Sequence, residues 1–177
     1  MSSINQQQAE HNVSHLAGQA AIDKLAELAR EAQTCFFCTE PLGPDGGERP
    51  MTVLDVDAQG KLWFLSASDS QQNQEIAANP RVKLFFQAAQ HGPFMVLQGQ
   101  ASISRDRARI EQLWRFPHKT WFTGGQDDPR ITVLQVAPEH GYYWDNKHGS
   151  AVAGVKILLG AVLGQTLDDS IEGKLRP

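Results

Sequence analysis

The spacing of apolar residues changes near residue 33, from a helical to a strand-like pattern. Between residues 16 and 33, Leu25, Leu28, Ala29 and Ala32 recur at helical spacing, which predicts a helix there. After it, short apolar and aromatic runs bounded by turn-forming residues predict strands. We expect these strands at Thr34–Thr39, Met51–Asp57, Lys61–Leu65, Arg81–Gln87, Phe94–Ser104, Ile131–Val136 and Gly141–Trp144.

Further helices are expected between and after the strands. Ser70 is a candidate N-cap for a helix that stops at Asn79-Pro80, and Ser104 is a candidate cap for a helix over residues 105–114. Residues 151–164 suit a short packed helix, and Pro138 is expected to separate the last two strands. Strands and helices do not alternate as they do in a parallel sheet. The pattern therefore predicts a mainly β protein with flanking helices, its antiparallel strands curled into a closed or nearly closed barrel.

Size and charge narrow the classes of function. The chain has 177 residues, and we expect a disordered polar tail over residues 1–15 followed by a single domain over 16–177. Its net charge of −4 is unlike that of a general nucleic-acid binder, although a few local cations would suffice for a phosphate-bearing ligand. The N-terminal residues lack the features of a signal peptide, and the longest apolar stretch, 151–163, is too short to span a membrane. A cytoplasmic protein without membrane or nucleic-acid partners is expected.

Cys35 and Cys38 form a CxxC motif inside an expected strand. A redox pair would place the motif at the start of a helix, and a zinc site would need two further ligands that the scattered histidines do not supply. Cysteine is also among the residues most often buried. We therefore interpret both as packed core cysteines and expect no metal site. The sequence contains no nucleophile elbow, P-loop or dinucleotide fingerprint, so no catalytic residue is assigned.

Cations and aromatic residues are interleaved between Trp114 and Phe122, with Arg115 and Lys119 among them. This mixture suits either a planar anionic ligand or a subunit interface, where Trp and Arg are enriched. The arginines at 105, 107 and 109 and the acidic pair at 127–128 are interpreted instead as solvated surface groups.

A possible phosphate site joins the start of one expected strand to the end of another. Arg49 begins the first strand, and Ser66, Ser68 and Ser70 lead from the second into a helix that contains Gln72. A helix N-terminus with nearby hydroxyls and a guanidinium can hold a phosphate group. A capped helix beside a surface arginine explains the same residues equally well. The residues alone leave both interpretations open.

Four motifs, in this order and spacing, resemble the pyridoxamine-phosphate-oxidase-like split barrels, and more closely their general stress protein subgroup. They are RPMTVLDVD, GKLWFLSASDSQQNQEIAANPRVKLFF, IEQLWRFPHKTWFTGGQDDPRITVLQV and GYYWD. The resemblance implies an antiparallel six-stranded split β-barrel and a homodimer that holds one FMN in each of two grooves at the interface. It also implies cofactor-binding roles for Arg49 and Ser66 at the phosphate, Met51 and Thr52 along the flavin, Ser68, Ser70 and Gln72 in the rest of the cradle, and Trp114 and Trp121 near the flavin region.

The chain departs from the family pattern at three places. Gln72 stands where a lysine is common, which should weaken phosphate binding by about 1.5–3 kcal/mol and leaves riboflavin or FAD as alternatives to FMN. Thr123 replaces a frequent proline, and the C-terminal Arg-x-His element of pyridoxamine phosphate oxidases is missing, so vitamin B6 oxidation is not expected. The resemblance therefore implies a flavin-binding general stress protein. It is either an oxidoreductase of unknown substrate, a non-catalytic flavin carrier or sensor, or a dimeric interaction module.

Overall fold

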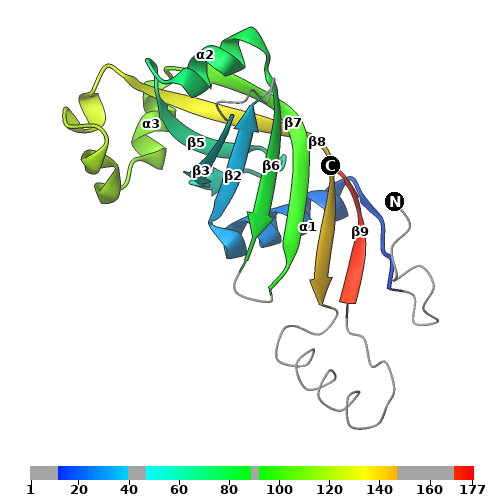
Figure 1. Cartoon of the computed structure of the whole chain (residues 1–177). Helices are drawn as coiled ribbons and strands as arrows, with labels where there is room; N and C mark the ends of the chain where they lie inside the picture. Colours follow the sequence, from blue (N-terminus) through cyan, green and yellow to red (C-terminus); the bar gives the residue numbers. More distant parts are fainter. Residues whose placement is uncertain (1–11, 40–46, 89–91, 147–169) are drawn as a thin grey trace.

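The computed structural model describes residues 12–39, 47–88, 92–146 and 170–177. Over these residues the protein is mainly β, with three α-helices around one mixed sheet of nine strands (Figure 1). The elements are β1 (Leu16–Ala17), α1 (Gln19–Ala32), β2 (Thr34–Thr39), β3 (Glu48–Thr52), β4 (Asp55–Val56), β5 (Leu62–Ala67), α2 (Gln71–Ala78), β6 (Arg81–Gln87), β7 (Phe94–Ser104), α3 (Arg107–Leu113), two 3-10 helices (Phe116–Thr120 and Gly125–Asp127), β8 (Ile131–Asn146) and β9 (Ser170–Arg176).

Strand pairing runs in the order β1-β9-β8-β7-β6-β2-β3, with β5 joined to β8 and β4 joined to β5. The pair of β1 and β9 is parallel, and the other strand pairs are antiparallel. The long strand β8 pairs with two different strands along one of its edges. Its first part, Ile131–Val136, pairs with β5, and its second part, Gly141–Asn146, pairs with β9.

This sheet differs from the expected six-stranded antiparallel barrel. It has nine strands, includes a parallel pair and is not closed. The difference has a local cause, because the strand expected over Met51–Asp57 is split at Val53 and Leu54. As a result β3 pairs with β2, whereas β4 pairs with β5. The other unexpected strands, β1 and β9, pair with each other and so needed a long-range contact to form.

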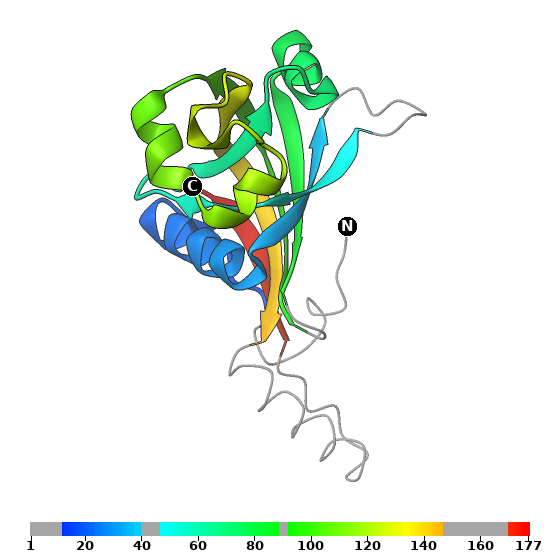
Figure 2. The same cartoon turned by 90° about the vertical axis from the view of Figure 1, so that its left-hand side faces the viewer.

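Side-chain alternation along the strands builds the main core. Along β5 every second residue is buried, and β6 shows the same alternation. Phe37 of β2 and Phe64 of β5 are fully buried and meet edge to face, with ring centroids 5.3 Å apart. Helix α1 covers this core with a stripe that includes Leu25 and Leu28, as its sequence predicts. It crosses behind the strands in Figure 1 and lies on one side of the sheet in Figure 2.

Strand β8 runs through Pro138, where the sequence predicts a break. The register between β7 and β8 shifts here, because Gly99 faces Pro138 while Gln98 faces His140. Proline has no N–H to donate, and a bulge of this kind tolerates the loss of that ladder bond. A Cβ on Gly99 would lie 2.2 Å from the Ala137 carbonyl oxygen, so the close approach of the two strands requires glycine.

The helix boundaries agree with the sequence in part. Helix α1 starts at Gln19 rather than at residue 16, because Leu16 and Ala17 form β1. Ser70 caps α2 as expected, whereas α3 is capped by Asp106 and not by Ser104. The helix expected over 151–164 and most of the expected N-terminal tail lie outside the described residues. Among the described helices, none combines the length and apolarity needed to cross a bilayer.

Candidate functional site

Two serine hydroxyls face each other at the turn from β5 into α2. Ser66 Oγ lies 3.2 Å from Ser70 Oγ. Ser70 also accepts the backbone N–H of Asn73 at 3.2 Å and thereby caps the helix. A hydroxyl donates one hydrogen bond and accepts others, so Ser70 can cap α2 and still face a ligand. The helix N-terminus therefore presents two adjacent hydroxyls.

Gln72, in the first turn of α2, places an unpaired donor beside these hydroxyls. Its side chain is only 4% exposed. Its Oε1 accepts from Ser66 at 3.4 Å, whereas its buried Nε2 meets no acceptor among the described residues. Leaving a buried polar group unpaired costs about 1–3 kcal/mol. The Nε2 group is thus a donor suited to an acceptor that the described chain does not supply.

Arg49 reaches from β3 to the same helix. Its Nη2 donates to Glu75 Oε2 at 2.8 Å, and the two side chains are 23% and 20% exposed. Its Nη1 is buried and, within the described residues, has no acceptor. Gln72 and Glu75 are three residues apart and therefore lie on one face of α2. We use the term cradle for Arg49, Ser66, Ser70, Gln72 and Glu75.

Glu75 is bound from several sides and carries a charge. Besides Arg49, its carboxylate accepts from Thr39 at 2.5 Å and from Gln71 at 2.8 Å. Desolvation alone would raise the pKa of Glu75, but the hydrogen bonds from Thr39, Arg49 and Gln71 and the charge of Arg49 outweigh it and lower the pKa. The side chain is therefore a carboxylate at neutral pH. Glu75 was not predicted as a site residue, although it follows Gln72 by three residues and so lies on the same face of the helix.

A second side-chain network fixes α2 to the sheet. Asn73 Nδ2 donates to Thr132 Oγ1 at 2.8 Å, and Thr132 donates to the Ser66 carbonyl oxygen at 2.8 Å. Thr132 belongs to β8, so this network ties α2 to both β5 and β8. It fixes the backbone of Ser66 relative to α2. No local pattern in the sequence pointed to Asn73 or Thr132.

The remaining residues expected near the phosphate and ring lie on two different surfaces. Ser68 and Asn73 line a separate cavity of about 420 Å³ beside α2. Met51 and Thr52 lie on β3, which is the last strand of the order and pairs with β2. The Met51 side chain packs against the core, and Thr52 is exposed. The structure thus connects Ser66, Ser70 and Gln72 by hydrogen bonds and links Arg49 to the same helix through Glu75, but it does not bring Ser68 into these hydrogen bonds.

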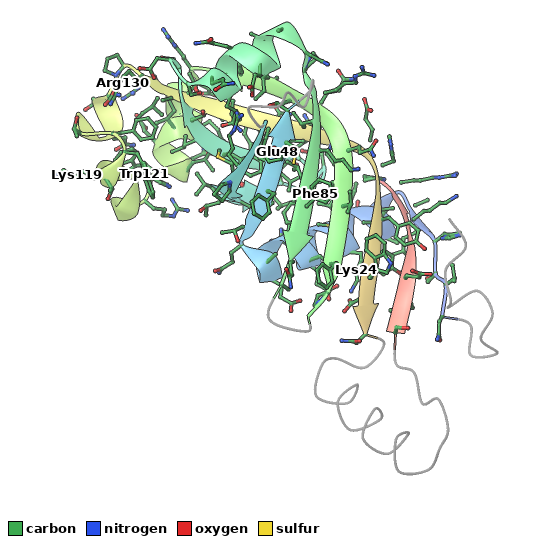
Figure 3. The ribbon with its side chains drawn as sticks, viewed as in Figure 1. Lys24, Glu48, Phe85, Lys119, Trp121 and Arg130 are labelled. Atoms are coloured by element: carbon green, nitrogen blue, oxygen red, sulfur yellow. The ribbon has the colours of Figure 1, made fainter. Side chains whose placement is uncertain are left out.

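The two tryptophans expected near the flavin are separated from each other. Trp114 packs with Phe122 and His118 in a small second core, at centroid distances of 6.3 and 5.5 Å. Trp121 is 67% exposed and lies with Lys119 at one end of the molecule (Figure 3). Arg115 donates to backbone carbonyls at the end of α3. These groups do not converge on one ligand within the described chain.

Two side chains that were expected to be solvated, those of Arg109 and Asp128, form ion pairs in the structure. Arg109 is 18% exposed, donates to Asp55 at 2.7 Å and stacks over the Trp63 ring at 4.0 Å. Asp128 is buried and paired with Arg130, whose hydrogen bonds are the main cause that lowers the pKa of Asp128 to about 2. Partners distant in the sequence remove Arg109 from water, and the turn that pairs Asp128 with Arg130 removes Asp128 from water.

An apolar surface occupies the face of the sheet opposite α1. Phe36 pairs with Phe85 across β2 and β6, and Phe94 pairs with Trp144 across β7 and β8. The four side chains are between 40% and 58% exposed. They line a cavity of about 620 Å³ that extends to Pro50 on β3. We call these four residues the open apolar face; Phe85 marks it in Figure 3.

The two cysteines are packed, as the sequence analysis proposed. Both thiols are free and buried. Burial raises the pKa of Cys35 to about 12 and also raises that of Cys38. Cys35 and Cys38 are three positions apart on an extended strand, which puts their Cα atoms about 10 Å apart, beyond the reach of a disulfide. In the described part of the chain, no three His, Cys, Asp or Glu side chains gather in a way that could hold a metal ion.

Comparison with known proteins agrees with this fold. The family model described as "Pyridoxamine 5'-phosphate oxidase like" matches residues 20–168. A candidate general stress protein 26 from Jannaschia sp. CCS1 is 22% identical and superimposes with a TM-score of 0.75, over 90% of this chain and 100% of that one. A general stress FMN/FAD binding protein from Xanthomonas citri is 25% identical with a TM-score of 0.60, over 71% of this chain and 87% of that one. General stress protein 26 from Bacillus anthracis str. Sterne is 20% identical with a TM-score of 0.60, over 69% of this chain and 92% of that one. No curated protein matches the chain.

These matches define the class of protein. The chain belongs to the pyridoxamine 5'-phosphate oxidase-like family, and several solved structures of similar fold are general stress proteins. The family model covers the whole stretch that carries the cradle and the open apolar face.

Proposed function

We propose that this protein binds a flavin and that its cradle holds the phosphate group of FMN. The observation that carries the proposal is the pair of buried donors, Arg49 Nη1 and Gln72 Nε2, which lack acceptors among the described residues. Gln72 contacts the Ser66 hydroxyl, which faces Ser70 at the N-terminus of α2, and Arg49 reaches the same helix through Glu75. Phosphate oxygens accept hydrogen bonds from all of these groups. The residues present therefore fit a phosphate.

Strand β3, which carries Arg49 of the cradle, is also the proposed contact for the flavin ring. Met51 and Thr52 follow Arg49 on β3, and that strand ends the pairing order, so its outer edge can offer main-chain groups. We propose that these two residues contact the ring. The Xanthomonas citri neighbour, an FMN/FAD binding protein, supports flavin as the ligand. When bound, a flavin would supply electron-transfer chemistry that the side chains themselves lack.

We also propose a homodimer that covers the open apolar face. Two cross-strand aromatic pairs are exposed together on one surface of the sheet. A monomer typically exposes large apolar side chains singly and not as a contiguous patch of this kind. A second copy of the chain would bury them. Trp121, exposed at the end of the molecule, is available to reach a partner subunit. Pro50 lines the cavity beside this face and stands between Arg49 and Met51 on β3, which supports a flavin site next to the proposed dimer interface.

Flavin binding and turnover are separate questions. An FMN-dependent oxidoreductase would reduce and reoxidise its bound flavin, whereas a carrier or sensor would bind flavin without turnover. Anaerobic mixing of the flavin-loaded protein with NADH or NADPH begins to separate these roles, because bleaching of the flavin absorbance reports reduction by a nicotinamide. The cytoplasmic location and the domain limits at residues 15 and 16 stay predictions.

The direct test is a titration of the ligand-free protein with FMN, followed by flavin fluorescence. We expect saturable quenching with a Kd below tens of micromolar. A visible spectrum and mass analysis of any small molecule that copurifies identify the flavin carried from the cell. Absence of a saturable change at tens of micromolar FMN, riboflavin and FAD would contradict flavin binding.

A further inference from the structure

Glu75 places a carboxylate inside a site whose other side chains are one cation, Arg49, and three neutral groups. Arg49 Nη2 donates a hydrogen bond to Glu75 Oε2 at 2.8 Å, and the side chains of Thr39 and Gln71 donate to the same carboxylate. The remaining members of the cradle, Ser66, Ser70 and Gln72, are neutral. Arg49 and Glu75 therefore cancel, and the side chains of the cradle carry no net charge.

We infer that Glu75 is a specificity-determining residue that keeps the cradle from favouring a doubly charged phosphate over an uncharged flavin tail. This inference rests on the proposed flavin binding and extends it to the class of flavin selected. A phosphate monoester carries a charge of about −1.5 to −2 at neutral pH, whereas riboflavin ends in an uncharged hydroxyl. Glu75 repels the first and not the second. The site accordingly accepts FMN with a smaller advantage over riboflavin than a cradle without Glu75 would show.

Three features of the contact support this role. An arginine can present two parallel donors to a phosphate, but here Nη2 is occupied by Glu75, which leaves Nη1. Glu75 has three hydrogen-bonding partners, so turning it away from the cradle would break several bonds at once. Its side chain is about four-fifths buried, where the interaction between charges is less screened than at the surface.

The test compares FMN and riboflavin binding by the wild type and by Glu75→Gln. Glutamine keeps the length of the side chain and can still accept from Thr39 and Arg49, but it carries no charge. Glu75→Ala is the second variant, since alanine suits a helix and removes the acceptor altogether. Glu31→Gln, which removes an equal charge from an exposed position on α1, is the matched control. Thermal unfolding shows that each variant is folded.

We expect Glu75→Gln to tighten FMN about tenfold, to change riboflavin less than twofold, and Glu75→Ala to act in the same direction. Glu31→Gln should change neither ligand. FMN binding that is unchanged or weaker in both Glu75 variants would overturn the inference, because Glu75 would then only hold Arg49 in position. Equal tightening of both flavins would overturn it as well. If neither flavin binds to the wild type or to any variant, the proposed flavin binding itself fails, which is a different result from flavin binding without discrimination by Glu75.

Discussion

Arg49→Ala is the sharpest perturbation of the proposed phosphate site. The substitution removes the one cation of the cradle and with it the buried, unpaired Nη1 donor. It also leaves the Glu75 carboxylate without its counter-charge, although the hydrogen bonds from Thr39 and Gln71 remain. The effect on the ligand should therefore fall on the phosphate and spare the ring.

The expected size follows from the loss of Nη1, the buried Arg49 nitrogen that has no acceptor among the described residues. A hydrogen bond to a charged group contributes about 1.5–3 kcal/mol, which corresponds to a loss of about tenfold to 150-fold in FMN affinity. Repulsion from the uncompensated Glu75 adds to this loss. Glu75 is largely buried and keeps two of its three hydrogen-bonding partners, so the substitution should cost the fold about 1–3 kcal/mol, less than the roughly 5–15 kcal/mol by which a typical domain is stable. The variant should consequently remain folded.

The assay is a pair of fluorescence isotherms, with FMN and with riboflavin, at one fixed salt concentration because screening affects the phosphate contact. Riboflavin affinity should change less than twofold. Arg107→Ala is the matched control, since that arginine on α3 is half exposed and pairs with Asp127 away from the cradle. Equal weakening of FMN and riboflavin would show that Arg49 supports the fold or the ring site, and the phosphate assignment would be wrong.

Three further substitutions test the cradle, the open apolar face and the buried Asp128. Gln72→Lys should tighten FMN at least tenfold without affecting riboflavin, while its buried ammonium lowers the melting temperature of the ligand-free protein; unchanged FMN binding by a folded variant would contradict the cradle. Phe85→Lys should convert the proposed dimer to a 19.5 kDa particle in light scattering, and a wild-type particle of that mass would refute the dimer. Asp128→Asn should lower the free energy of unfolding at pH 7. The folded pKa of Asp128, about 2, lies below its unfolded value of about 3.9, so the stabilisation is present above pH 4 and disappears as the pH falls through 2. A pH-independent difference between Asp128→Asn and the wild type in urea unfolding would contradict this.

The sequence determined the elements whose cause is local. The spacing of Leu25 and Leu28 identified the buried face of α1, and Ser70 identified the start of α2. The strands β2, β6 and β7 have the bounds that their apolar runs predict. The motifs around Arg49 and Ser66 also identified the family, because their order and spacing are visible in one dimension.

Contacts between distant segments were decided by the tertiary structure alone. Pro138 is accommodated in the long strand β8 because Gly99 on β7 lets the two backbones approach each other. Nothing in the sequence near either residue indicates that the two pair. The strands β1 and β9 form by pairing across the length of the chain. In the same way, Thr39 and Arg49 come from two strands to meet Glu75 on α2. The start of helix α2 was enough to predict a phosphate cradle from the sequence. The net charge of that cradle, however, depends on Glu75, which only folding brings into contact with Arg49.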